Sequence, residues 1–342
     1  MFGFGSMLKD YLEYHRISQS DFAERLGVTK KHINNILNEN ADISEDLMIA
    51  ISLVTDIDIN LIALVETKKR LYNYLNERFK SEKEINDFLN SFYIKEMSKK
   101  NWITLNDKTS YLQNAYDLLK YLNVRDFNIF DKYSKEKIFF KKYDNSNLKK
   151  VFLWIKRCDN LIKDQNPVGY SALSINKLLA ELEKERNKPF NKKSLVEIFN
   201  KYGFYLVIED ALVGTKVRGC TKVIGNNPAI YMTCHLKEKS SFYFALYHEI
   251  GHVKSDYNRA KSKAIIDGDD ALEKRADLFA TKKMIDDETY EMILNDLKNK
   301  EEICKEKNIP LCFLYSRLAY DGIIKYNNKD YLKNRESLNY DN

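Results

Sequence analysis

The residues best suited to chemistry are two histidines and a glutamate in the segment 247–252, Tyr-His-Glu-Ile-Gly-His. In an α-helix, residues four apart lie on one face, so the imidazoles of His248 and His252 can meet a single Zn²⁺. Glu249, beside the first histidine, would reach a water molecule at the metal and serve as a general base. The spacing therefore predicts a zinc site on a helix, and a third protein ligand is needed to complete it.

The elements around this segment fit that prediction. No proline interrupts residues 240–255, which predicts a helix there, and residues 228–233 read as a strand that precedes it. Apolar residues recur at helical spacing within the predicted helix: Phe242, Ala245, Leu246 and Val253.

A third ligand is predicted about one helix and one loop downstream. Residues 271–280 place Glu273, Ala276, Asp277 and Ala280 on one helix face. The small alanines would let this helix approach the histidine helix, so that Glu273 completes three ligands and the fourth position stays open. Asp277 is placed to accept a hydrogen bond from a ligand histidine. The alternative is that both carboxylates only form surface ion pairs on their own helix; the upstream motif favours the metal site.

Composition predicts an ordinary globular protein. The chain has 342 residues, of which 44% are apolar and 31% charged, and its length suits two or three domains. Its five cysteines include no C-x-x-C pair and are odd in number, which favours reduced thiols in a cytosol. No apolar run approaches the ~18 residues of a membrane span, and the first residues do not resemble a signal peptide. We therefore expect a cytoplasmic protein that does not contact a membrane.

The net charge of +6 is unevenly distributed. Residues 1–65 hold five basic and ten acidic side chains, a balance of −5, so the remainder carries +11. Lysines alternate with aromatic residues around 132–143, a pattern that can grip single-stranded nucleic acid. A solvated helix face explains the same pattern more simply, and we favour that interpretation.

Residues 18–37 predict two short helices that meet at a glycine. Ser18 would cap the first helix, Gly27 would supply the positive φ of a sharp turn, and Thr29 would cap the second helix. Apolar residues on the inner faces would hold the pair together: Phe22, Ala23, Leu26, Ile33 and Ile36. This pattern predicts a helix-turn-helix whose second helix enters a DNA major groove.

The segment from Leu12 to about Val65 resembles the Xre/Cro-type helix-turn-helix, particularly the form in HigA-like antitoxins. The resemblance implies that Gln19, at the start of the first helix, contacts a DNA phosphate and that Thr29, at the start of the second, contacts the DNA backbone. It also implies that four residues of the second helix face bases: Lys30, Lys31, Asn34 and Asn35. The alternative is a helical pair used for dimerisation or partner docking. Because the local charge is −5, we expect DNA binding that is weak or that requires a homodimer.

Residues 170–325 resemble the ImmA/IrrE metallopeptidase family. The shared features are the HE-x-x-H segment, the E-x-x-AD-x-FA helix at 273–280 and a closing helix with Arg317-Leu318. Asp286 stands where the family commonly has a proline, which changes a helix end and not the chemistry. The resemblance implies a zinc-dependent endopeptidase that cuts a repressor protein and relieves repression in a stress response or in mobile-element or toxin–antitoxin control.

The predicted fold class is multidomain: an all-α helix-turn-helix and a helical spacer, followed by an α+β zincin-like metallopeptidase domain with a small sheet. The predicted boundaries are 1–65, 66–169, 170–300 and, for a C-terminal helical segment, 301–342. Beyond Asp330 we expect a frayed end. Helices are predicted at 68–79, 82–92, 111–121, 148–161 and 193–202, and a strand at 204–208.

The strand before the histidine helix is expected to bind substrate backbone by strand addition, through Ile230, Tyr231, Met232 and Thr233. Candidate oxyanion-stabilising residues are His235, Tyr243, Tyr247 and Tyr257, each more simply explained as structural. The rival interpretation of the whole chain is a non-proteolytic, antitoxin-like autorepressor with a structural or sensory metal site. Glu249 argues against a closed structural site, which has no use for a general base.

Overall fold

The computed structural model divides the chain into two compact units, Met1–Lys120 and Tyr121–Asn342. Within the part of the chain that it describes, no helix is long and apolar enough to cross a membrane. The predicted boundary at residue 65 lies inside a helix, α5 (Ile59–Asn76), and the later part of the predicted spacer belongs to the second unit. The structure describes residues 3–79, 81–106, 111–127, 129–130, 132–133, 138–140, 145–267 and 270–340.

The first unit begins with the predicted helical pair. Ser18 Oγ accepts a hydrogen bond from the Asp21 amide (3.1 Å), and Thr29 Oγ1 accepts one from the His32 amide (3.2 Å). Gly27 joins the two helices at φ 65°, where a side chain would be strained. Both predicted caps and the glycine turn are therefore present. The helices are α1 (Phe4–Tyr14), α2 (Gln19–Arg25), α3 (Lys30–Leu37), α4 (Glu45–Val54) and α5.

The long helix α5 is part of the same small core. The Phe4 amide at the start of α1 donates a hydrogen bond to Glu66 Oε1 (3.1 Å), and Glu66 is 1% exposed. A cut at residue 65 would leave this amide without its partner, which is a physical reason why the unit extends beyond the predicted boundary. Three further helices of this region are α6 (Glu82–Ser91), α7 (Ile94–Lys99) and α8 (Tyr111–Leu122).

A five-stranded sheet organises the second unit, in the order β1-β5-β3-β4-β2. β3 and β4 form an antiparallel hairpin, with a turn that includes Gly225 at φ 62°. β2 pairs with β4 in parallel, β5 pairs with β3 antiparallel, and β1 pairs with β5 in parallel. The strands are β1 (Ile138–Phe140), β2 (Tyr205–Glu209), β3 (Gly219–Ile224), β4 (Asn227–Thr233) and β5 (Ala264–Asp267).

The position of β4 corrects one prediction. Ile230 lies opposite Thr221 of β3 on one side and Leu206 of β2 on the other, and Thr233 pairs with Glu209 while its amide donates to the Arg218 carbonyl. Both edges of this strand are therefore occupied. The expectation that Ile230, Tyr231, Met232 and Thr233 receive a substrate strand is wrong, because an added strand needs a free edge.

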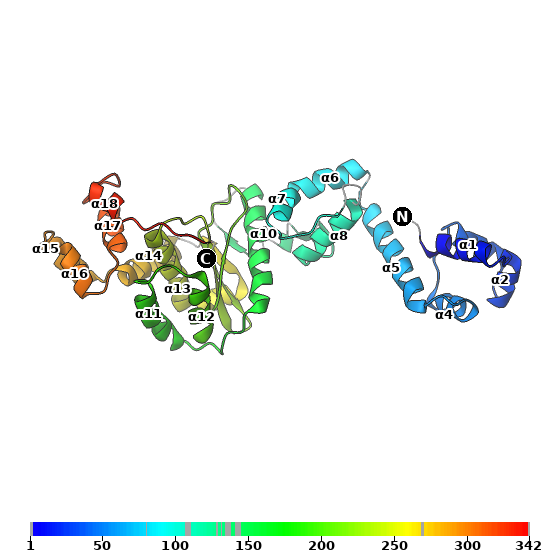
Figure 1. Cartoon of the computed structure of the whole chain (residues 1–342), viewed down its shortest axis with the longest axis horizontal. Helices are drawn as coiled ribbons and strands as arrows, with labels where there is room; N and C mark the ends of the chain where they lie inside the picture. Colours follow the sequence, from blue (N-terminus) through cyan, green and yellow to red (C-terminus); the bar gives the residue numbers. More distant parts are fainter. Residues whose placement is uncertain are drawn as a thin grey trace. The chain divides into compact units, whose positions relative to one another are not determined.

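Helices cover both faces of this sheet (Figure 1). On one face, α11 (Ser174–Glu185), α12 (Lys192–Lys201) and α13 (Lys239–Ser262) share a hydrophobic core with β2 and β4. On the other face lies α10 (Asn145–Leu161), whose Trp154 ring meets the Tyr231 ring edge-on. α14 (Asp270–Met284) packs beside α13.

The described residues after 330 form more contacts than expected. Short helices follow α14: α15 (Asp287–Asn295), α16 (Lys300–Glu306), α17 (Leu311–Tyr320) and α18 (Lys329–Lys333). Beyond them, Ser337 forms a β-bridge with Glu238, and Glu336 forms a 2.7 Å ion pair with Lys239 at the start of α13. The expectation of a frayed end beyond Asp330 is wrong, because these contacts tie residues 336–338 to the histidine helix.

Candidate metal centre

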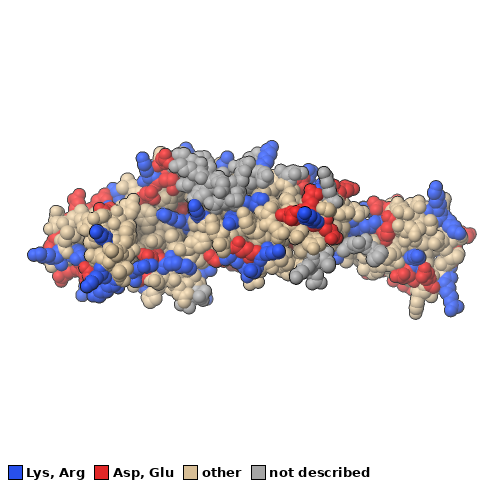
Figure 2. All heavy atoms as spheres, turned by 90° about the horizontal axis from the view of Figure 1, so that it is seen from above, with Lys and Arg blue, Asp and Glu red and all other residues tan. Residues whose placement is uncertain are grey.

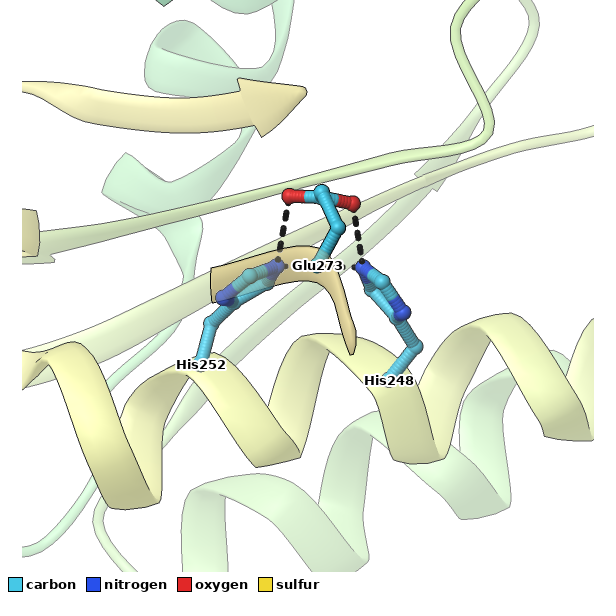
Figure 3. A group of neighbouring side chains, drawn as sticks. All are labelled: His248, His252 and Glu273. Atoms are coloured by element: carbon cyan, nitrogen blue, oxygen red, sulfur yellow. Dashed lines mark hydrogen bonds and ion pairs between the residues drawn. The ribbon is translucent and has the colours of Figure 1, made fainter. Parts of the chain in front are cut away.

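The two histidines and Glu273 converge at the contact between α13 and α14 (Figure 3). Glu273 Oε2 lies 3.2 Å from His248 Nε2, and Glu273 Oε1 lies 3.4 Å from His252 Nε2. The two Nε2 atoms are 3.0 Å apart. With one ligand atom taken from each side chain, the three residues lie within 4.8 Å of one another. Among the described residues, no other set of three or more histidine, cysteine and acidic side chains does so.

The donor set suits zinc in both type and spacing. Imidazole nitrogen and carboxylate oxygen are ordinary Zn²⁺ ligands, and bonds of about 2.0–2.1 Å in a tetrahedron place ligand atoms about 3.3 Å apart. The 3.0 Å between the two Nε2 atoms and the 3.2 Å from His248 Nε2 to Glu273 Oε2 lie close to that value, and His252 Nε2 lies 3.4 Å from the other Glu273 oxygen, Oε1. With three protein donors, a tetrahedral ion would keep one position for water or substrate.

Small residues bring the two helices together. A Cβ placed on Gly251 would lie 3.2 Å from the Ala276 Cα and 3.2 Å from the Phe279 ring, closer than most such contacts. Ala276 and Ala280 are 2% and 0% exposed, as expected for the inner face of α14. The close approach positions Glu273, one turn before Ala276, over the two histidines.

Each histidine is held by its own carboxylate. His248 Nδ1 lies 2.8 Å from Asp277 Oδ1, as predicted, and His252 Nδ1 lies 3.1 Å from Asp256 Oδ2. Asp256 is buried, and its other oxygen accepts a hydrogen bond from Arg275 of α14 (3.0 Å). A carboxylate on Nδ1 fixes the proton there and leaves the Nε2 lone pair for a metal.

Asp256 also marks an irregularity in the helix. Its backbone is non-helical, with φ −127° and ψ 19°, so α13 is kinked at this residue. The kink comes one turn after His252, where the Asp256 carboxylate is held by two partners, His252 and Arg275. The distortion therefore sits at the residue that orients one of the candidate ligands.

The carboxylates make the site attractive to a cation. Burial disfavours protonation of His248, but the hydrogen bonds that its ring donates to Asp277 and Glu273 outweigh this effect and raise its pKa to about 10. For His252, burial acts in the same way and is outweighed by Glu273, so its pKa is also raised. A field that holds a proton on imidazole also favours a divalent ion between the rings, and the two compete for the same nitrogens.

Glu249 follows His248 in α13 and is 4% exposed. Thr221 Oγ1, on β3, donates a 2.6 Å hydrogen bond to Glu249 Oε2. Gly219, two residues earlier on the same face of β3, leaves room for the carboxylate, since a Cβ there would lie 2.4 Å from Glu249 Oε1. Burial raises the pKa of Glu249, while the histidines and Thr221 act in the opposite direction. A raised carboxyl pKa suits a group that takes up and returns a proton near neutral pH.

The sequence interpretation missed three of these residues. Asp256 had a signal, because it stands four residues after His252 and so on the same helix face. Gly219 and Thr221 stand in no pattern of the sequence that indicates this role. Both act through the pairing of β3 beneath α13, which depends on contacts distant in the sequence.

The structure gives the four oxyanion candidates other surroundings. Tyr243 and Tyr247 are buried in the hydrophobic core, where the Tyr243 ring meets Phe313. The Tyr257 hydroxyl donates to the Asn226 carbonyl (2.7 Å). His235 Nε2 lies 3.6 Å from Asp210 Oδ1. These contacts give structural roles to Tyr243 and Tyr257.

Comparison with known proteins identifies only the first part of the chain. The sequence profile of the helix-turn-helix family matches residues 8–62. This segment is a helix-turn-helix domain. The match agrees with the capped helices and the glycine turn described above, and it supports a DNA-binding regulatory role. No curated protein and no solved structure matches the chain.

The helix-turn-helix domain presents most of the expected DNA contacts to solvent. Thr29, Lys30, Lys31 and Asn34 are exposed, at the start and on the outer face of α3. Gln19 and Asn35 are half-buried, and Asn34 Oδ1 accepts a hydrogen bond from Asn38 (3.1 Å). Their contacts with bases or phosphates stay predictions. On the face shown in Figure 2, basic and acidic side chains are interspersed.

Proposed function

We propose that the chain is a zinc-dependent endopeptidase that also regulates transcription through its helix-turn-helix domain, and that its substrate is a repressor protein. The observation that carries the proposal is the convergence of His248, His252 and Glu273 next to Glu249, a buried carboxylate whose charge interacts with both histidines. The match at residues 8–62 supports the DNA-binding part, and the resemblance to ImmA/IrrE peptidases supports the repressor as substrate.

The residues have separate roles in this mechanism. His248, His252 and Glu273 would hold the ion, which when bound supplies Lewis acidity toward the scissile carbonyl and toward water. Glu249 takes up a proton from the attacking water and transfers it to the leaving amine. Asp277 and Asp256 keep the two imidazoles in the tautomer that donates Nε2.

Two observations favour chemistry over a structural role for the ion. Structural zinc sites are usually closed by four cysteine or histidine ligands, whereas this group has three donors, one of them a carboxylate. The site is also partly open, since the Glu273 side chain is 24% exposed and that of His248 is 14% exposed. The donors are therefore partly accessible to solvent.

A second candidate function is a DNA-binding autorepressor whose metal site is sensory. The helix-turn-helix match fits it equally well, because that match says nothing about cleavage. The two functions differ in one observable outcome. A peptidase produces a cut repressor, whereas a metal sensor changes only its own affinity for DNA.

The deciding experiment is to incubate the purified protein with repressors encoded beside its gene, with and without a chelator. We expect about one Zn²⁺ per chain and a cut repressor that disappears when the chelator is present. His248→Ala and His252→Ala should lose both, whereas His235→Ala, which removes a partly exposed histidine elsewhere, should keep both. Full zinc occupancy in the double His248→Ala/His252→Ala variant would rule out this metal site.

A further inference from the structure

A cavity of about 240 Å³ lies in the second unit, between α10, the end of α13 and the start of β5. Four lysines and one aspartate contribute its charge: Lys156 and Asp159 on α10, Lys222 on β3, and Lys261 and Lys263 around the end of α13. Their formal charges sum to +3, so the cavity is basic.

This cavity is separate from the candidate metal centre. Successive residues of a strand point to opposite faces of a sheet. Thr221 reaches Glu249 on the α13 side, whereas Lys222 Nζ lies 2.9 Å from Asp159 Oδ1 on the α10 side. The inference drawn from the cavity therefore does not rest on the proposed peptidase activity.

Lys156 forms no ion pair with the described residues. Lys156 Nζ lies 5.7 Å and 5.6 Å from the ring centroids of Tyr133 and Phe152, and no carboxylate of the described residues comes within ion-pair distance of it. Its side chain is half-buried. Burial lowers the pKa of Lys156, and repulsion from Lys222 acts in the same direction against the attraction of Asp159. A partly buried, unpaired ammonium among other lysines is costly, and a bound anion would relieve that cost.

The other groups of the cavity narrow the class of anion. Ammonium groups bind phosphate as point charges. Asp159 would repel a bare anion, but it can accept hydrogen bonds: Oδ1 already accepts from Lys222 and from the Tyr231 hydroxyl (2.7 Å). Oδ2 has no hydrogen-bond donor among the described residues, so it is placed to accept one from a ligand hydroxyl. The volume is below the roughly 300–1,000 Å³ of sites for drug-sized ligands.

We propose that this cavity binds a sugar phosphate, either free or as the ribose phosphate of a mononucleotide, with the phosphate at Lys156 and Lys263 and a sugar hydroxyl at Asp159.

The test is a calorimetric titration of the full chain with four probes: ribose 5-phosphate, adenosine 5′-monophosphate, inorganic phosphate and ribose. We expect saturable binding of ribose 5-phosphate that weakens as salt increases, weaker binding of inorganic phosphate and none of ribose. Tighter binding of the nucleotide than of ribose 5-phosphate would identify the nucleotide as the source, and the reverse order would identify a free sugar phosphate. The absence of saturable binding by both esters at millimolar concentration would overturn the proposal. Equal affinity for inorganic phosphate and both esters would overturn the sugar assignment.

Variants locate the binding. Lys156→Gln should weaken binding of ribose 5-phosphate about tenfold or more, because it removes the unpaired ammonium. Lys177→Gln, an exposed residue of α11 outside the cavity, removes the same charge and should leave affinity unchanged. Where Lys156→Gln does not fold, as judged by thermal unfolding, Lys263→Gln at the exposed rim provides the same comparison. Wild-type affinity in the folded variant would show that the ligand binds elsewhere.

Discussion

Thr221 donates a 2.6 Å hydrogen bond to Glu249, so a hydroxyl of the sheet holds the carboxylate that we propose as the general base. Thr221→Val keeps the shape of the side chain and removes this bond. We expect peptidase activity to fall about 10- to 100-fold with zinc content unchanged, as for other supporting contacts of metal sites. Because the Thr221 bond lowers the Glu249 pKa, its loss should move the acid limb of the pH–rate profile to higher pH.

Thr221→Ser is the matched control, because it retains the hydroxyl. It should restore most of the activity and return the acid limb toward its wild-type position. Equal activity and equal pH profiles for the valine and serine variants would show that the hydrogen bond does not support Glu249.

A second prediction concerns the space beside the same carboxylate. Gly219→Ala would place a Cβ 2.4 Å from Glu249 Oε1, so the carboxylate must move. We expect peptidase activity to fall about tenfold or more with zinc retained, since small displacements of reacting groups are costly. Gly169→Ala, where an added Cβ meets nothing within 4 Å, should behave as wild type. The prediction fails where both alanine variants have wild-type kcat.

The Asp256 carboxylate provides a third prediction. Asp256→Asn removes the charge that holds His252 Nδ1 and that Arg275 neutralises. We expect a 10- to 100-fold loss of zinc affinity, measured by competition with a chromophoric chelator. Glu291→Gln, on the exposed side of α15, controls for the loss of a negative charge. Unchanged zinc affinity in the Asp256 variant would mean that the contact with His252 is not needed for metal binding.

The helix-turn-helix domain provides a fourth prediction, for DNA. Lys30→Gln and Lys31→Gln should weaken specific binding to the chain's own promoter and reduce the dependence of that binding on salt. The reason is that a protein with one lysine fewer releases fewer counterions from DNA when it binds. Lys9→Gln, on the exposed side of α1, makes the same charge change away from α3. Gel shifts at low and physiological salt decide it. Equal effects of Lys9→Gln and the α3 variants would show that α3 is not the recognition helix, and no specific complex at either salt, with or without repressor, would assign the domain to protein docking.

The features that depend on neighbouring residues were predicted from the sequence. The caps at Ser18 and Thr29 and the turn at Gly27 depend on neighbours a few residues away, so their chemistry can be read directly. The same holds for the face shared by His248 and His252, which four-residue spacing fixes on any helix. The contact of Asp277 with His248 was also predicted, from spacing on the second helix.

Features set by distant pairing could not be read from the sequence. Neither β3 nor β5, which is four residues long, was predicted, and the place of β4 inside the sheet follows from strands on both sides. For the same reason the strand-addition site was assigned wrongly. The contacts of residues 336–338 were missed because Glu336 is paired with Lys239, almost a hundred residues earlier.

The most direct test of Glu249 as the general base is cleavage by Glu249→Gln, measured together with the zinc content of the variant. Glu249 is proposed as base and not as ligand, so the variant should keep about one Zn²⁺ per chain while cleavage of a repressor that wild type cuts falls by several orders of magnitude. Undiminished cleavage by a zinc-loaded Glu249→Gln protein would contradict the mechanism.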